Sequence, residues 1–550
     1  MTDTDACLSG RHGNALQHAR LAVESGPRDA CNWQHLGLTL LQMRQYDEAD
    51  VAFRHAVAID DACSVAWNCT GMLACRRQCY QEAESCFIKA IEARPDDTAA
   101  LCNFASSLKL TGRIDEAAVL LAPAVDALPG DLGVQWVAAV LANYRPDLGG
   151  QDVLRQHERF AAALEKSVGQ PAPMPHRDHN SSGGPLRVGF LSPDMRRHSV
   201  AHFLLPLIRA MDRSRFTVLC YSLADVHDEI TALFQLAADG WRDSSALSDT
   251  ALVSRIRSDE VDVLIDCAGL FEGARPAVLA MRAAPLQVAW LGYPSGLGLK
   301  SIHCRMLDAW SSPLGAEGDP MSDGIALIDG CFLAYDPLAD EPLPQRNAYR
   351  NAPVTFGCFN DSSKWNPVML DQWGQLLREV GGSRLLLKAR ALECAEVCGW
   401  VHAEFAARGI GKERLELRGF VGSQAAHRAM YGDVDIALDT FPYHGVTSTC
   451  EALWMGVPVV TLLGEAHAGR AGASLLHAAG HPEWVAASFE EYRGIAGSLA
   501  ADRGRLALLQ AMLREPLRGS QLFDTRGFAR RFELALQRIR ARANHLNPRH

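Results

Sequence analysis

Two different patterns of hydrophobic and polar residues divide this chain. Up to residue 163, apolar residues recur at the spacing of amphipathic helices, which predicts an all-helical region. From residue 186 onward, short apolar runs alternate with amphipathic stretches, which is typical of parallel strands that alternate with helices. Residues 164–185 lie between the two patterns and are rich in proline, glycine and serine, so they predict a linker.

The helical region, residues 1–163, repeats itself with a period of 34 residues. Trp33, Trp67 and Leu101 are spaced by this period, and a small residue follows each of them four positions later. The other repeating positions are Tyr46, Tyr80 and Ile114; Ala49, Ala83 and Ala117; Phe53, Phe87 and Leu121; and Ala56, Ala90 and Ala124. Large and small residues at this period resemble the tetratricopeptide repeat, in which two helices pack through small residues. Such arrays form a superhelix whose concave face holds peptides, although a purely structural role stays open for so short an array.

The alternating region is expected to form two doubly wound α/β halves, at residues 186–352 and 353–550. The strands expected are Arg187–Leu191, Thr217–Ser222, Val261–Cys267 and Leu286–Leu291, then Thr355–Asn360, Arg384–Ala389, Leu415–Phe420, Val434–Asp439 and Pro458–Leu463. A last helix over Gly527–Arg542 is expected to pack back across the first half. Ligands bind off the carboxyl ends of strands in such sheets, so the loops that follow the strands are where a site is sought.

The stretch Asp435–Leu476 carries the strongest chemical signal. It predicts a strand, a loop that contains Gly445, a helix that opens at Thr447-Ser448-Thr449, and a second strand. The first turn of a helix has free N–H groups and the positive end of the helix dipole, which suits a phosphate group. The alternative is that these hydroxyls only cap the helix.

Two other loops carry candidate groups. Lys364 follows an expected strand, where its charge would neutralise a diphosphate leaving group; the alternative is a solvated lysine. His198 precedes a helix after the first expected strand, where an imidazole would lie near a substrate oxygen. His202 is one helical turn further on, but no third ligand is evident nearby, so this pair does not predict a metal site.

Composition narrows the class of protein. The chain has 550 residues, a net charge of −10 and 48% hydrophobic residues, which favours several globular domains and gives no support for nucleic-acid binding. The polar, acidic N-terminal residues do not predict a signal peptide, and no apolar run is long enough to span a membrane. The 16 cysteines are scattered and include no Cys-x-x-Cys pair. Free thiols in the reducing cytoplasm are therefore expected.

Four runs of the α/β region, together with the repeats, resemble one family. The runs are Arg187–His202 (RVGFLSPDMRRHSVAH), Ala284–Pro294 (APLQVAWLGYP), Phe356–Asn366 (FGCFNDSSKWN) and Asp435–Leu476. They are similar to the protein O-glycosyltransferases related to O-linked N-acetylglucosamine transferase, above all to the SPINDLY branch. The resemblance implies an N-terminal tetratricopeptide-repeat α-solenoid and a GT-B unit of two Rossmann-like α/β domains. It also implies inverting, metal-independent transfer of a sugar from a nucleotide-sugar donor to serine or threonine of a polypeptide held by the repeats, without a cofactor.

The same resemblance implies roles for individual residues. Lys364 would hold the donor diphosphate, and Thr447 and Ser448 would contact the same phosphates. His427 would stack on or bond the nucleobase, and Glu451 would bond the ribose. The catalytic residues implied are His198 and Lys364, and the donor-binding residues are Asp361, His427, Gly445, Thr447, Ser448, Thr449 and Glu451.

Three departures leave the donor and the acceptor open. Gln424 stands where the N-acetylglucosamine enzymes have a lysine, Leu270 stands where SPINDLY relatives often have histidine, and the loop after Pro294 lacks the usual threonines. UDP-N-acetylglucosamine is the favoured donor, because it is the commonest in the family. GDP-fucose is the alternative, because the run from Asp439 is nearer the SPINDLY branch, whose plant member transfers fucose. A degenerate scaffold that only senses nucleotide sugar and transfer to a non-protein acceptor also stay open.

Overall fold

The computed structural model of the protein describes residues 3–173, 184–312, 324–344 and 353–546. The chain divides into two compact units, which are described separately below. One unit contains residues 1–141 together with residues 390–401, and the other contains residues 142–389 and 402–550.

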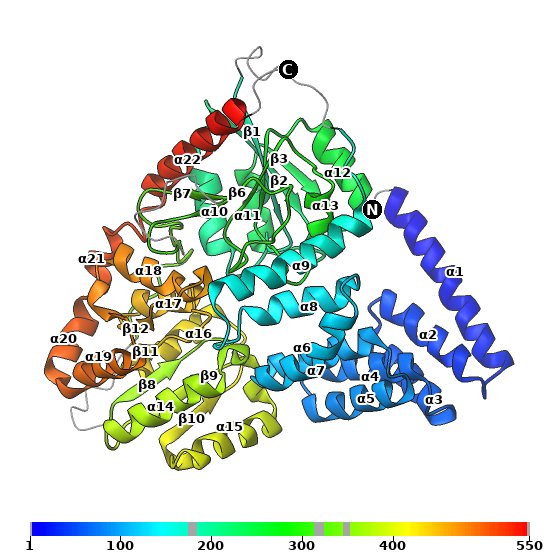
Figure 1. Cartoon of the computed structure of the whole chain (residues 1–550), viewed down its shortest axis with the longest axis horizontal. Helices are drawn as coiled ribbons and strands as arrows, with labels where there is room; N and C mark the ends of the chain where they lie inside the picture. The colour runs from blue at the N-terminus through cyan, green and yellow to red at the C-terminus, as the bar shows by residue number, and fades with distance from the viewer. Residues whose placement is uncertain (1–2, 174–183, 313–323, 345–352, 547–550) are drawn as a thin grey trace. The chain divides into compact units, whose positions relative to one another are not determined.

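The first unit is an array of paired helices (Figure 1). The helices are α1 (Asp3–Ser25), α2 (Ala30–Gln42), α3 (Tyr46–Ile59), α4 (Ser64–Arg76), α5 (Tyr80–Ala93), α6 (Thr98–Leu110), α7 (Ile114–Ala127) and α8 (Leu132–Ala142). The period of 34 residues has a direct structural cause. A Cβ atom added to Gly37 would lie 2.6 Å from the Phe53 ring, and one added to Gly71 would lie 2.7 Å from Phe87. Each pair of helices therefore packs one aromatic ring against the backbone of its partner.

The turn between the two helices of a pair repeats as well. Arg44 (φ 60°), Gln78 (φ 64°) and Gly112 (φ 83°) are spaced by 34 residues and all have left-handed backbone conformations. A left-handed residue is common where a helix ends, because it turns the chain and satisfies the last carbonyl groups. Two of the three positions hold residues other than glycine, so the turn geometry is retained at some cost in strain.

The boundary of the array differs from the sequence expectation. Helix α9 (Gly150–Val168) runs across the boundary expected at residues 163 and 164, and it belongs to the second unit. Phe160, Ala161 and Leu164 are buried on one face of this helix. The amphipathic pattern therefore continues past residue 163, and so does the helix. Of the expected linker, residues 174–183 lie outside the described residues.

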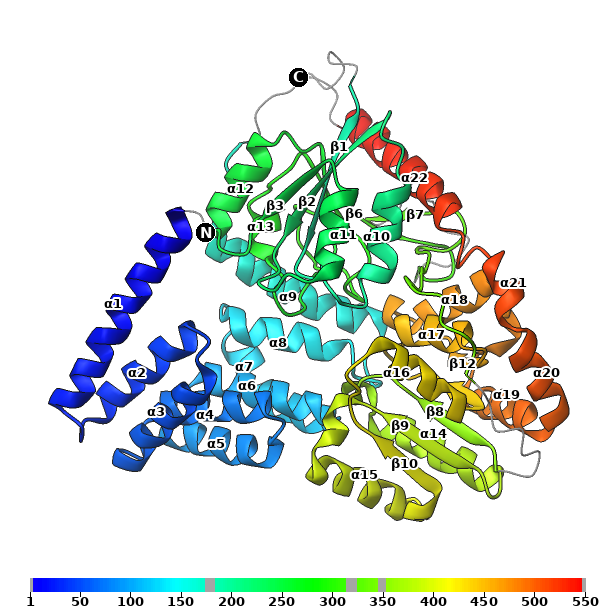
Figure 2. The same cartoon turned by 180° about the vertical axis from the view of Figure 1, so that it is seen from behind.

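The second unit contains two parallel sheets (Figure 2). The first sheet consists of β1 (Leu186–Ser192), β2 (Phe216–Ser222), β3 (Gly240–Asp243), β4 (Val263–Asp266), β5 (Leu286–Ala289), β6 (Cys304–Leu307) and β7 (Ile325–Leu327), in the order β3-β2-β1-β4-β5-β6-β7. The helices that join its strands are α10 (Ala201–Ala210), α11 (Glu229–Ala237), α12 (Asp249–Ser258) and α13 (Pro276–Ala280). This is the Rossmann strand order, with its switch point between β1 and β4.

The second sheet has the same topology with one strand fewer. Its strands are β8 (Thr355–Cys358), β9 (Arg384–Lys388), β10 (Leu415–Arg418), β11 (Ile436–Leu438), β12 (Val459–Leu462) and β13 (Val485–Ala486), in the order β10-β9-β8-β11-β12-β13. The helices are α14 (Pro367–Glu379), α15 (Ala395–Ala407), α16 (Gln424–Ala429), α17 (Thr447–Trp454), α18 (Ala471–Ala479), α19 (Phe489–Ala501), α20 (Arg503–Met512), α21 (Arg514–Arg518) and α22 (Thr525–Leu546). The expected class, helical repeats followed by two Rossmann-like α/β domains, is confirmed.

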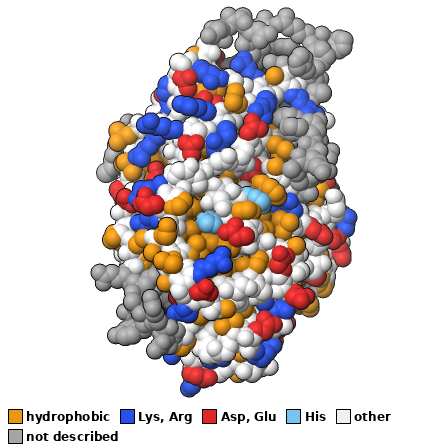
Figure 3. Space-filling view, turned by 90° about the vertical axis from the view of Figure 1, so that its left-hand side faces the viewer, with side chains coloured by type: hydrophobic (Ala, Val, Ile, Leu, Met, Phe, Trp, Pro, Cys, Tyr) orange, Lys and Arg blue, Asp and Glu red, His pale blue; other side chains and the backbone are white. Residues whose placement is uncertain are grey.

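The last helix, α22, returns to the first half, as the sequence predicts. Phe528, Phe532 and Leu536 of α22 are buried in the same hydrophobic core as Phe190 of β1. Its outer face is basic and carries Arg526, Arg530, Arg538 and Arg542, all of which are exposed. Figure 3 shows lysine and arginine side chains gathered on the upper part of this side of the molecule.

The packing of the array gives a first prediction. We expect Gly71→Val to destabilise the array by about 1–3 kcal/mol, because the added side chain must displace the Phe87 ring. The control is Gly130→Val, because Gly130 is exposed and a Cβ atom there meets no atom within 4 Å. Circular dichroism would record the melting curves. Equal melting midpoints for the two variants would contradict this account of the repeat.

Candidate functional site

The loop that follows β11 is held by one buried carboxylate. Asp439 is 2% exposed, and its Oδ1 atom accepts hydrogen bonds from the backbone N–H groups of Thr440 (2.9 Å) and Gly445 (2.7 Å). The same oxygen accepts a bond from the side chain of Asn360 (3.2 Å), while Oδ2 accepts one from the Thr461 hydroxyl (2.8 Å). A buried carboxylate with four donors is fully paired, so it fixes the loop between β11 and α17.

Gly445 is needed in this loop for reasons of space. A side-chain carbon at position 445 would overlap Ser448 Oγ and Asn360 Oδ1. The N–H group of Gly445 is taken by Asp439, so it is not available to a ligand. Gly445, predicted to bind the donor, therefore lets the loop approach α17.

The first turn of α17 carries the three predicted hydroxyl residues, and two of the hydroxyls already have partners. Ser448 Oγ donates to Asn360 Oδ1 (2.7 Å), and Thr449 Oγ1 donates to the Gly445 carbonyl (2.7 Å). Thr447 is half-buried, and its hydroxyl makes no hydrogen bond to any part of the chain that the structure describes. The N-cap residue, Val446, provides no side-chain cap, so the N–H groups of the first turn lack the usual capping acceptor. This helix end is open to an anion.

Lys364 lies beside this helix end, in the short 3-10 helix η1 (Ser362–Lys364) that follows β8. Its Nζ atom donates to the His444 carbonyl (2.7 Å) and lies 3.8 Å from the centre of the Tyr443 ring. No carboxylate of the described residues forms an ion pair with it. Burial lowers the pKa of Lys364 to about 8, while Asp439 and Asp361 oppose the shift. The loop thus holds a cation that has no ion-pair partner of its own.

Asp361, another predicted residue, acts within its own turn. Its carboxylate accepts hydrogen bonds from the backbone N–H (3.0 Å) and the hydroxyl (2.5 Å) of Ser363, so it caps η1. The side chain is exposed, and it orients Lys364 through the backbone of η1.

The other end of the predicted site forms a separate cluster around Glu451, which is 5% exposed. His427 Nε2 lies 2.9 Å from Glu451 Oε2, and Gln424 Nε2 lies 3.5 Å from Glu451 Oε1. Lys388 Nζ lies 2.9 Å from the other ring nitrogen of His427. Burial raises the pKa of Glu451, but the bond from His427 and the charge of Arg428 outweigh it, so the pKa is lowered and the carboxylate is ionised.

The two clusters lie along one helix. Ser448 and Glu451 are three residues apart on α17, so they share a face. The loop after β8 also reaches both, because Asn360 bonds Ser448 while the Phe359 ring lies 5.8 Å from the His427 ring. The structure therefore brings together eight of the nine predicted residues, all but His198: Asp361, Lys364, His427, Gly445, Thr447, Ser448, Thr449 and Glu451.

His198 is placed in the first half, after β1. It is exposed, its Nδ1 atom lies 3.5 Å from Asp194 Oδ1, and the same atom accepts a bond from the backbone N–H of Val200 (3.3 Å). Desolvation lowers the pKa of His198, and Asp194 opposes this. These contacts lie within its own loop. His202 instead is buried and joins the halves, because its Nε2 atom accepts a bond from Gln424 (2.8 Å).

Sequence reasoning missed three residues that build this region: Asp439, Asn360 and Lys388. The signal for Asp439 was a carboxylate at the end of an apolar run, and Lys388 likewise ends the run Leu-Leu-Leu-Lys. The sequence analysis includes both residues in expected strands, Arg384–Ala389 and Val434–Asp439, and assigns them no role in a site. Their roles depend on atoms that come from other strands.

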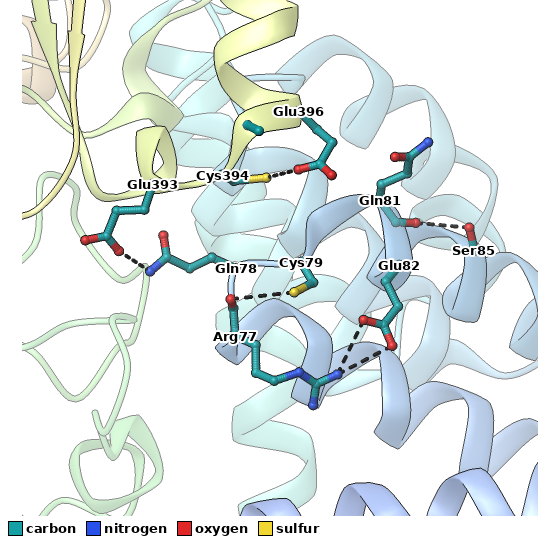
Figure 4. Close-up of a pocket in the computed structure, with 10 residues that line it drawn as sticks. Arg77, Gln78, Cys79, Gln81, Glu82, Ser85, Glu393, Cys394 and Glu396 are labelled. Atoms are coloured by element: carbon teal, nitrogen blue, oxygen red, sulfur yellow. Dashed lines mark hydrogen bonds and ion pairs between the residues drawn. The ribbon is translucent and has the colours of Figure 1, made fainter.

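Other features of the described residues bear on the class of protein. No group of three or more His, Cys, Asp and Glu side chains in them is arranged to hold a metal ion. No helix of the described part is long and apolar enough to cross a membrane. A hollow of about 740 Å³ lies in the first unit between the α4–α5 turn and residues 393–396, and Figure 4 shows Cys79, Cys394 and the ion-paired Arg77 and Glu82 around it. None of the predicted site residues lines this hollow.

Helical repeats followed in the chain by two Rossmann-like halves, with an uncapped helix start beside a buried lysine in the second half, are the features of a repeat-bearing protein of GT-B architecture. The profile of glycosyl transferase family 41 matches residues 156–339 and 340–532, and a tetratricopeptide repeat matches residues 32–63. The chain belongs to glycosyl transferase family 41, which confirms the resemblance seen in the sequence.

Individual relatives agree with this assignment. The chain is 33% identical over 360 residues to the probable UDP-N-acetylglucosamine–peptide N-acetylglucosaminyltransferase SPINDLY of Arabidopsis thaliana, a match that covers 64% of this chain and 39% of the relative. It is 30% identical to the probable transferase SEC of the same plant, over 63% of this chain and 36% of the relative. The chain thus spans about two-fifths of the length of these curated relatives.

A solved structure covers more of the chain. The Thermobaculum terrenum O-GlcNAc transferase superposes with a TM-score of 0.82 at 29% identity, over 99% of this chain and 100% of that one. The likeness therefore includes the helical array as well as both α/β halves.

The contacts of Asp439 give a second prediction. Asp439→Asn replaces one acceptor oxygen by an N–H donor that must face other donors, so we expect a loss of about 2 kcal/mol. Asp433→Asn is the control, because Asp433 is exposed and pairs only with Arg418, which is worth less than about 1 kcal/mol. Scanning calorimetry would measure both. A melting midpoint of Asp439→Asn equal to that of the control would show that the carboxylate does not hold the loop.

Proposed function

We propose that the chain is a protein O-glycosyltransferase that transfers N-acetylglucosamine from UDP-N-acetylglucosamine to serine or threonine hydroxyls of polypeptides. The observation that carries this proposal is the pairing of Lys364 with the uncapped start of α17. The family supplies the reaction class, and the printed names of the relatives supply the donor and the peptide acceptor.

The chemistry needs positive charge where the leaving group departs. The acceptor oxygen forms a bond to the anomeric carbon while the bond from that carbon to the diphosphate breaks, which inverts the configuration. The charge that develops on the diphosphate would be stabilised by the Lys364 ammonium group and by the first-turn N–H groups of α17. These groups provide the charge without a metal ion, so no cofactor forms part of the proposal.

The nucleoside would lie one turn further along α17. Glu451 would accept hydrogen bonds from the ribose, and the ring of His427 would stack on the base. His198, from the first half, would lie near the transferred sugar and the acceptor. A polypeptide acceptor would be held by the helical repeats, as in other arrays of this kind. We place the reaction in the cytoplasm, because no disulfide joins the described cysteines.

A second donor has one observation in its favour. Gln424 replaces the lysine of the N-acetylglucosamine enzymes, and its amide is bound to His202 and lies near Glu451. The nucleoside end of this site therefore has a neutral, hydrogen-bonded amide where the N-acetylglucosamine enzymes have a charged lysine. This difference keeps GDP-fucose as the alternative donor.

The donor is tested by thermal shift. We expect UDP and UDP-N-acetylglucosamine to raise the melting midpoint, because a ligand that binds only the folded state stabilises it by about 2.7 kcal/mol at 100 times its Kd. A shift with GDP and GDP-fucose alone would transfer the assignment to the fucose donor. A well-folded sample that shifts with none of the four would contradict the proposed function.

The role of Lys364 gives a further prediction. Lys364→Ala should lower sugar transfer to a serine- and threonine-containing peptide library by about 10²–10³-fold while the fold is retained. Lys412→Ala, at an exposed lysine of the same half, is the control. Only the ammonium form can stabilise the diphosphate, so kcat/KM of the unmodified chain should fall as the pH rises through about 8. Full transfer by Lys364→Ala, or equal labelling of a library without serine and threonine, would contradict the proposal; donor binding without any transfer would favour the sensing scaffold.

A further inference from the structure

Lys388 is a cation of the nucleoside end to which the family resemblance assigned no role. It is the last residue of β9, so it lies at the carboxyl edge of the second sheet, where ligands bind in this fold. Its side chain is half-buried and forms no ion pair with any carboxylate of the described residues. Burial lowers the pKa of Lys388, and the charge of Glu451 opposes this. Its one described side-chain partner is His427.

The contact between Lys388 and His427 fixes the hydrogen atoms of the histidine ring. An ammonium group has donors and no acceptor, so the Nδ1 atom of His427, 2.9 Å away, must accept and carries no hydrogen. The ring hydrogen is then on Nε2, which donates to Glu451 Oε2 at 2.9 Å. Lys388 therefore selects one tautomer of His427 and one orientation of its ring.

The other groups around His427 cannot replace this contact. The rings of Phe359 and Tyr431 lie 5.8 Å from the His427 ring and give it apolar walls. Of the charged groups nearby, Glu451 is bound to Nε2, and Arg428 is turned toward Glu341 (2.6 Å) and Glu451 (3.6 Å). Without Lys388, Nδ1 has no donor among the described residues, so the ring is free to flip.

A fixed ring matters if a nucleobase stacks on it. Stacking and a hydrogen bond to Glu451 both require one ring plane, and a ring that flips loses part of the binding free energy as conformational entropy.

We propose that Lys388 is a positioning residue of the donor site: it holds His427 as the neutral Nε2–H tautomer, bound to Glu451, so that its ring is preorganised for the nucleobase. The inference rests on the proposed function for the identity of the ligand, but the tautomer can be measured without any ligand.

The first test is spectroscopic. Long-range ¹⁵N–¹H correlation spectra of histidine-labelled full-length chain distinguish protonated from unprotonated ring nitrogens, and a His427→Gln sample assigns the signals. We expect His427 to carry its hydrogen on Nε2 in the unmodified chain and in Lys388→Arg, and to show a mixture of forms in Lys388→Met. A hydrogen on Nδ1 in the unmodified chain would overturn the inference without any variant.

The second test is kinetic. Lys388→Met should raise the KM for the donor about 5–20-fold with kcat changed less than about twofold, because the lost interaction is the same in the ground state and in the transition state. Lys388→Arg should restore most of the affinity, and Lys412→Met is the control for loss of a lysine from this half. Should Lys388→Met fail to fold, Lys388→Leu, which also has no donor, replaces it in both tests.

The outcomes separate the inference from the proposed function. If the unmodified chain binds no nucleotide sugar, the proposed function fails while the tautomer experiment still decides the role of Lys388. If the chain binds its donor and Lys388→Met retains both the KM and the His427 spectrum, the inference fails and the proposed function stands.

Discussion

In both α/β halves, loops that follow parallel strands are held by carboxylates buried where those strands end, and the site loop after β11 is one of them. Asp439 after β11, Asp308 after β6 and Asp266 at the end of β4 each accept hydrogen bonds from at least two backbone N–H groups of the following loop. Burial raises the pKa of Asp266 to about 6, and it also raises that of Asp308. Each of these carboxylates accepts at least two loop N–H groups, so leaving this geometry would cost several hydrogen bonds at once.

Loops fixed in this way can hold buried lysine side chains that form no ion pair. Lys364 and Lys388 stand at the carboxyl edge of the same sheet, and neither forms an ion pair in the described part of the chain. A desolvated cation is unfavourable by itself, so the fold must supply the energy that keeps it there. An anionic group bound beside Lys364 would recover part of that energy, and α17 places the cluster of Glu451, His427 and Lys388 one turn further on from Ser448.

The sequence predicts most of this fold and only part of the site. Apolar runs predict nine of the strands of the two sheets, but not β3, β6, β7 and β13. β3 is half-exposed at an edge, β6 is interrupted by Arg305, and β13 has two residues, so none of them has the apolar run of a buried strand. The predicted site residues cluster because their loops share a sheet edge. The partners Asp439, Asn360 and Lys388 could not be predicted, because a hydrogen bond between strands depends on register and rotamer rather than on residue type.

The two α/β halves are connected by hydrogen bonds that lie close to the nucleoside end of the site. His202, from α10 of the first half, donates to the carbonyl of Asp336 (2.7 Å). Arg428, from α16 of the second half, donates to the carbonyl of Pro337 (2.8 Å) and is completely buried. Helices of both halves therefore donate hydrogen bonds to the same short segment, residues 336–337. Breaking the Arg428 contacts would leave a buried charge unpaired, which would destabilise the fold by about 3–5 kcal/mol. The segment therefore ties α10 of the first half to α16 of the second half close to Glu451, which Arg428 and Gln424 both approach.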